Sequence, residues 1–345
     1  MEEMQLSQLT EQLFQGFSLD GDKLTDAVLD GDFIIVVRML WEATLDSIGK
    51  PFTYLWEYFI AFLLIGIGAA TLKQLNHLYE NTQIQKTSTW IVYLILIKQL
   101  MVLYYNGVEV ASGCLGRLLE FGKVFVPTFS AALTLASGSL TGTGYIATLS
   151  LIIYVIEQIL GLIVLPVIEA YMLLSILGSI WQKERVEHIL NLLEKGVLLS
   201  FKVVFTFVTG ISLLQSMILP FIDQTKVGAV KKVIGVIPGV GGISQTAMEM
   251  ISGGAVLLKN GIGVIGILLL LVVCAAPLIK VGLICITLKV TAIVYGFLDE
   301  KNMTWCVDKL GIAQGFLLKV IGAGLILFVI WILLAVYTTN QRLWM

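Results

Sequence analysis

Charged residues are scarce in this sequence. Asp, Glu, Lys and Arg make up 13% of the 345 residues, whereas hydrophobic residues make up 57%. A soluble domain usually carries about a quarter charged residues, so too little polar surface is present to cover a water-soluble globule. Residues 124–156, 203–222, 260–279 and 320–341 contain no charged residue at all. Each of these runs reaches the about 20 apolar residues that a helix needs to cross a bilayer.

Lipid offers no hydrogen-bond partners to the backbone, so spanning segments must be helices or a closed barrel. The uncharged runs are continuously apolar and do not alternate, which favours helices. We therefore predict an all-α fold, a polytopic integral membrane helical bundle with six to nine crossings. Residues 1–50 form a short N-terminal region, and residues 51–345 form the multi-span membrane domain.

Residue patterns that carry common enzyme chemistry are also missing. The two histidines are isolated, the four cysteines form no CxxC pair, and there is no P-loop, HExxH or intramembrane-protease motif. "GIGVIG" at residues 261–266 fits a dinucleotide fingerprint literally, but it opens an apolar run instead of following a strand. We predict no catalytic, metal-binding or cofactor-binding residues. The sequence has no dense Lys/Arg cluster of the kind that binds nucleic acid, so we expect no nucleic-acid partner. The expected surroundings of the chain are membrane lipid.

Residues 1–50 are acidic, with ten acidic and three basic residues. Apolar residues from Phe33 to Ile48 recur at helical spacing, which predicts an amphipathic helix at a membrane surface. No cleavable signal peptide is visible, so we expect insertion to depend on the first span, near residues 52–72.

Two long apolar blocks contain proline and glycine, which disfavour regular helix. We predict helix breaks or interfaces at these positions in two groups, which are Pro127, Gly138, Gly142, Gly144 and Pro166 in the first block and Pro238, Gly239, Gly241, Gly242, Gly253, Gly254 and Pro277 in the second.

The two blocks resemble each other at an offset of 111 residues, at which Pro127 meets Pro238 and Pro166 meets Pro277. This spacing favours an internal duplication with halves at 89–180 and 197–298, followed by a final span at 316–338. Duplicated halves with interrupted helices are a recurrent plan for transporters. Chance similarity between apolar segments is the alternative.

Ionisable residues within apolar runs are candidates for internal sites, because a charge at the centre of a spanning helix costs about 2.5–3.5 kcal/mol. Glu157, Glu169 and Lys280 are the candidate intramembrane charges. Glu169 and Lys280 each follow a matched proline by three residues, so an ion pair between them is one hypothesis. Glu57, Lys202 and Lys289 are instead expected to reach a membrane interface.

The segments "FVPTFSAALTLASGSLTGTGY" (125–145) and "KKVIGVIPGVGGISQTAMEMISGGAVLLKNGIGVIG" (231–266) resemble the stage III sporulation protein AE family of endospore-forming bacteria. The resemblance implies a multi-pass protein of the mother-cell membrane around the forespore. Its implied partners are the stage III sporulation proteins AA to AH and the forespore Q protein, in a secretion-like channel. Members often begin with a signal peptide, whereas none is visible in this sequence.

Three functions remain open at this point. The first is a non-enzymatic channel subunit that forms the permease-like core of that complex. Assembly of several copies into a homo-oligomer is left open. The second is a secondary transporter of a small solute, and the third is a structural membrane anchor for ring-forming partners.

Overall fold

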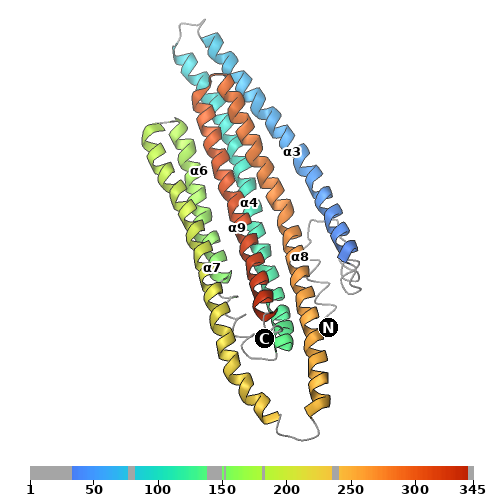
Figure 1. Cartoon of the computed structure of the whole chain (residues 1–345). Helices are drawn as coiled ribbons and strands as arrows, with labels where there is room; N and C mark the ends of the chain where they lie inside the picture. The colour runs from blue at the N-terminus through green and yellow to red at the C-terminus, as the bar shows by residue number, and fades with distance from the viewer. Residues whose placement is uncertain are drawn as a thin grey trace. The chain divides into compact units, whose positions relative to one another are not determined.

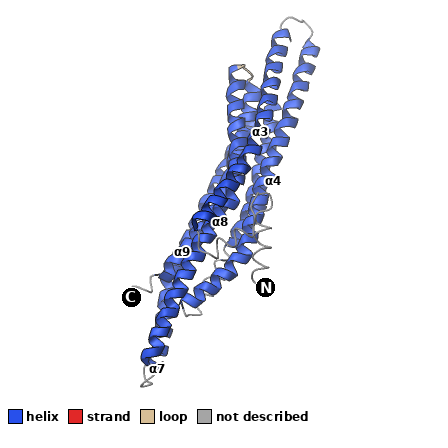
Figure 2. Ribbon diagram, turned by 90° about the vertical axis from the view of Figure 1, so that its right-hand side faces the viewer, coloured by secondary structure: helices blue, strands red, loops and turns tan. Residues whose placement is uncertain are grey.

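A computed structural model describes residues 33–76, 82–137, 150, 153–180, 183–234 and 241–340 of the chain. Within these ranges the backbone is helical apart from the short turn at residues 298–300, and no strand is present (Figure 2). The predicted all-α fold is confirmed for this part of the chain.

The helices are long, as Figure 1 shows. They are α3 (Phe33–Asn76), α4 (Thr82–Ser137), η1 (Leu160–Val164), α6 (Leu165–Ile180), α7 (Lys183–Ile234), α8 (Gly241–Phe297) and α9 (Lys301–Asn340), and residues 153–159 form a helical turn before η1.

Five segments of the described helices are long and apolar enough to cross a membrane. They are Leu55–Leu75, Thr87–Ala131, Ile153–Ile180, Gly261–Phe297 and Lys301–Val336. The last begins well before the predicted final span at 316–338.

A helix rises about 1.5 Å per residue, so the 57 residues of α8 extend about 85 Å, far beyond the about 30 Å hydrocarbon core. Helix number therefore does not equal crossing number, and six to nine crossings stays a prediction.

At several of the proline and glycine positions the predicted helix break is wrong, and the alternative of an interface stays a prediction. The helix α4 continues through Pro127, and α8 continues through Gly253, Gly254 and Pro277. A proline removes one backbone hydrogen bond, whereas a complete break exposes several groups that lipid cannot satisfy. Continuing the helix is therefore the less costly solution within apolar sequence.

Pro166 does not end its helix either, but it distorts it. The π-helix η1, Leu160–Val164, lies directly before Pro166, and residues 153–180 stay helical throughout. A proline ring collides with the carbonyl group four residues earlier, which here is Leu162 at the centre of η1. The wider π-turn moves that carbonyl away from the ring.

The remaining predicted breaks lie at the ends of the described segments or outside them. Gly138, Gly142, Gly144, Pro238 and Gly239 fall outside the described residues, whereas Gly241 and Gly242 are the first two residues of α8. A helix start does not contradict the break predicted at Gly241 and Gly242, which stays a prediction. The internal duplication stays a prediction.

The helix predicted from Phe33 to Ile48 is present as part of α3, and its position at a membrane surface stays a prediction. Residues 1–32 lie outside the described residues. The helix continues through residue 50 without interruption, so the boundary expected there falls inside one element.

The chain divides into two compact units. Unit 1 comprises Met1–Leu115, Leu160–Ser200 and Val272–Gly322, and unit 2 comprises Gly116–Ile159, Phe201–Leu271 and Ala323–Met345. In unit 1, α4 buries Leu96, Leu100 and Leu103, and α9 buries Leu310, Ala313 and Leu317, in each case on one helical face.

Unit 2 has an aromatic core. Phe121, Phe125 and Phe129 of α4 stack along one face, with ring centroids 4.9 and 5.2 Å apart. Trp331 of α9 meets Phe125 and Phe129 edge-on at about 6 Å, the geometry that ring quadrupoles favour.

Candidate functional site

One buried polar contact of unit 1 joins α9 to α4. Gln314 of α9 is fully buried, and its Nε2 donates to the backbone carbonyl of Tyr104 at 3.5 Å. A Cβ atom at Gly107 would collide with the Gln314 amide, so glycine is what allows this approach. Neither Gln314 Oε1 nor the Tyr104 hydroxyl has a hydrogen-bond partner among the described residues. Burying such groups unpaired is costly, which marks this place as more than apolar packing.

The candidate charges Glu169 and Lys280 both belong to unit 1. The Lys280 ammonium donates to Asn106 Oδ1 of α4 at 3.4 Å. Glu169 of α6 is half-buried and interacts electrostatically with Tyr104. No ion pair joins Glu169 to Lys280 in the described structure, so the hypothesis that they pair is wrong. Lys280 instead contacts an amide of α4.

A different ion pair lies between α8 and α9. Lys289 Nζ donates to Asp308 Oδ1 at 2.7 Å, and both side chains are about 40% exposed. The aliphatic stem of Lys289 passes against Gly311, where a larger residue would stand in its way. Lys289 therefore pairs within the protein, and its position at a membrane interface stays a prediction.

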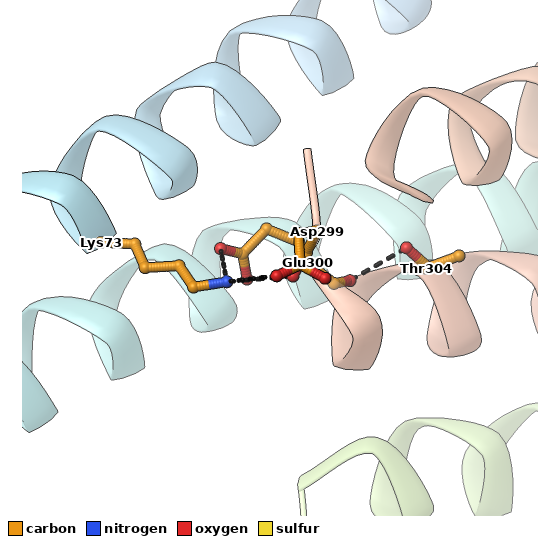
Figure 3. Close-up of polar contacts among 4 residues, drawn as sticks. All are labelled: Lys73, Asp299, Glu300 and Thr304. Carbon is orange, nitrogen blue, oxygen red and sulfur yellow. Dashed lines mark hydrogen bonds and ion pairs between the residues drawn. The ribbon is translucent and has the colours of Figure 1, made fainter. Parts of the chain in front are cut away.

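One end of unit 1 holds an ionic cluster around the α8–α9 turn (Figure 3). The Lys73 ammonium donates to the Asp299 carbonyl at 3.0 Å and lies 3.7 Å from Asp299 Oδ2 and 3.6 Å from Glu300 Oε1. Thr304 donates both its backbone N–H and its hydroxyl to the Glu300 carbonyl, which caps α9. Asp299 has a φ of 56°, a left-handed conformation that Asp tolerates better than most residues.

The start of α7 lies at the same end of unit 1. Lys183 donates to the Lys301 carbonyl at 3.3 Å, and its ammonium lies 5.9 Å from the centre of the Trp305 ring. Burial lowers the pKa of Lys183, and the nearby Lys301 ammonium acts in the same direction, although Glu187 opposes both.

Glu157, the third candidate charge, lies in unit 2 and is only 4% exposed. Its burial supports an internal position, and its role stays a prediction.

Cys114 and Cys274 are buried free thiols of unit 1 with sulfur atoms 3.7 Å apart. Among the described residues, no group of three or more His, Cys, Asp or Glu side chains is arranged to hold a metal ion. Within the candidate spans, Lys280 is therefore paired with an amide and Lys289 with a carboxylate.

Sequence reasoning missed Asn106, Asp308 and Gln314. Gln314 is the one amide in the run "GIAQGFLL", and flanking glycines were its available signal. Asp308 follows Lys289 by 19 residues across a turn, so only the helical hairpin reveals the pair.

Comparison with known proteins identifies a family. The family model described as "Stage III sporulation protein AE" matches residues 19–339. "Stage III sporulation protein AE" of Bacillus subtilis (strain 168) is 22% identical over 265 residues, which cover 74% of this chain and 66% of that protein, slightly less than two thirds. No solved structure matches the chain. Because the family model covers nearly the whole chain, the chain belongs to the stage III sporulation protein AE family.

Proposed function

We propose that the chain is a non-enzymatic, multi-pass membrane subunit of a secretion-like sporulation channel between mother cell and forespore. Its location is the mother-cell membrane around the forespore, where it forms the permease-like core. Its partners are the stage III sporulation proteins AA to AH and the forespore Q protein. The supporting observation is the family match over residues 19–339, in a chain whose described part contains five helices suited to crossing a membrane.

The test is purification of the full chain from sporulating cells with an affinity tag. We expect several of the AA to AH proteins and the Q protein to co-purify after mild detergent extraction. A tagged multi-span protein of the same membrane is the control for non-specific capture. Recovery of the chain without any of these partners, together with normal spore formation after its deletion, would contradict the proposal.

A secondary transporter is the second candidate, favoured by the Lys289–Asp308 pair and the Lys280–Asn106 contact within candidate spans. Paired ionisable residues inside spanning helices are typical of substrate or proton pathways. A transporter works without the other sporulation proteins, so reconstitution of this chain alone in vesicles separates the two functions. Solute uptake that is lost in Asp308→Asn supports transport, whereas vesicles that take up no solute support the channel subunit.

A further inference from the structure

Two exposed helix faces of unit 1 carry ionisable residues, and one of them lies within a candidate membrane span. On α4, Lys98, Val102, Tyr105 and Glu109 follow one another at helical spacing and are all exposed. Lys98 and Glu109 lie within the candidate span Thr87–Ala131. We call these four residues the α4 face. Charges within a span tend to face a partner or water instead of lipid.

The second face lies on α7 and repeats the same spacing. Glu184, His188, Asn191 and Lys195 are all exposed, and we call them the α7 face. Leu192 beside it is 69% exposed. This mixture of a large apolar residue with charges is typical of a protein interface more than of a surface that meets only water or only lipid.

The two faces have complementary charge order. The α4 face begins with a base and ends with an acid eleven residues later, and the α7 face begins with an acid and ends with a base, also eleven residues later. Eleven residues make about three helical turns and rise about 16 Å. The acidic and the basic residue of each face therefore lie on the same side of their helix.

The structure also aligns the faces in height. The helices α4, α7 and α9 begin at the same end of unit 1, because Lys73 contacts the α8–α9 turn and Lys183 contacts Lys301. A Cβ at Gly178 would meet both Val186 and Trp305, which places the start of α7 level with Trp305. These contacts fix a common origin for the three helices.

From that origin, Gln314 lies nine residues further along α9, about 14 Å, where it contacts α4 at Tyr104 and Gly107. On α7, Val186 lies at the level of Trp305, and nine residues further along is Lys195. Glu109 is therefore level with Lys195, and Lys98 with Glu184, within about one helical turn.

We infer that the α4 face of one copy docks on the α7 face of a second copy of this chain. The helices run parallel in this arrangement, with Glu109 opposite Lys195 and Lys98 opposite Glu184. Different surfaces meet, so the contact is head-to-tail and generates a ring where the rotation closes. The inference concerns the chain alone, so a failure here leaves the proposed sporulation channel untouched.

The first test measures the oligomeric state of the full chain in detergent by native mass spectrometry. Wild type is expected to be oligomeric, and Glu109→Lys or Lys195→Glu should each reduce the oligomer at least tenfold. The double swap should restore it to within twofold of wild type. Glu57→Lys, an exposed charge reversal in the candidate span of α3, is the matched control and should change nothing. A monomeric wild type, or a double swap no better than either single change, overturns the interface.

A second measurement does not depend on charge reversals that could impair folding. Val102→Cys and His188→Cys in one chain should give a ladder of disulfide-linked species in membranes after mild oxidation, whereas each change alone should give none. Absence of a ladder from the paired variant overturns the proposal. Dimers formed by Val102→Cys alone also overturn it, because they show that two α4 faces meet.

Discussion

At the residue scale, the contact between Gln314 and Gly107 decides how closely α9 approaches α4. We predict that Gly107→Ala destabilises the chain by about 1–3 kcal/mol, because the added methyl group collides with a buried amide. Thermal unfolding of the purified chain in detergent measures this. Gly68→Ala is the control, since no neighbouring atom lies within 4 Å of its Cβ position, and it should be neutral or slightly stabilising. Equal effects of the two substitutions would show that the close approach is not real.

Asp299 tests the geometry of the α8–α9 turn. We predict that Asp299→Gly is neutral or stabilising, whereas Asp299→Val lowers stability by about 1–2 kcal/mol, because a β-branched residue is strained at a φ of 56°. Lys73→Met removes the ion pairs without changing the turn and should cost less than about 1 kcal/mol, since Lys73 is 45% exposed. If the valine and glycine variants unfold at the same temperature, the left-handed conformation is wrong.

At the element scale, η1 contains one residue more than a regular helix would need between the same neighbours. We predict that deletion of Leu162 combined with Pro166→Ala yields folded protein, because the π-turn reverts to α-helix and both flanking faces keep their direction. The measured quantity is the yield of monodisperse protein after extraction.

Deletion of Leu173 is the matched control, because Leu173 is also exposed but lies in regular helix. Its loss rotates the following buried residues by about 100° and should abolish folding. Deletion of Leu162 with Pro166 retained should give less protein than the combined variant, because the ring would again meet a carbonyl. Equal yields from the Leu162 and Leu173 deletions would exclude a role for the π-turn.

The prolines of the apolar helices differ in their effect on the structure. Proline and glycine were good indicators of local distortion at Pro166 but poor indicators of helix ends at Pro127 and Pro277. Their effect depends on whether neighbouring turns and packed helices compensate for one lost hydrogen bond, and a residue list does not contain that compensation.

At the scale of the whole molecule, the contacts of Lys73 and Lys183 bring three inter-helix connections to one end of unit 1. We predict that Gln74→Cys, Arg185→Cys and Asn302→Cys, all at exposed positions near these connections, react with a membrane-impermeant thiol reagent from the same side of the membrane. Vesicles of known orientation provide the measurement, and the unsubstituted chain provides the background labelling. Labelling of one of the three from the opposite side would refute this common end.

The sequence by itself determined the class of the molecule, because uncharged runs of about 20 residues or more leave few alternatives to helices in lipid. The segments at 125–145 and 231–266 likewise sufficed to identify the family. Charge placement also gave Glu157, Glu169 and Lys280 as residues that need an internal explanation.

Only the tertiary structure decided the partners of these charges. Lys280 meets Asn106 and Lys289 meets Asp308, although a sequence repeat suggested a pair between Glu169 and Lys280. A helix fixes which residues share a face through its own geometry, so spacing reveals faces. Which faces meet depends on the packing of several helices at once, as where Gly107 admits Gln314, and that packing decides which charges are paired and which are left for a second copy.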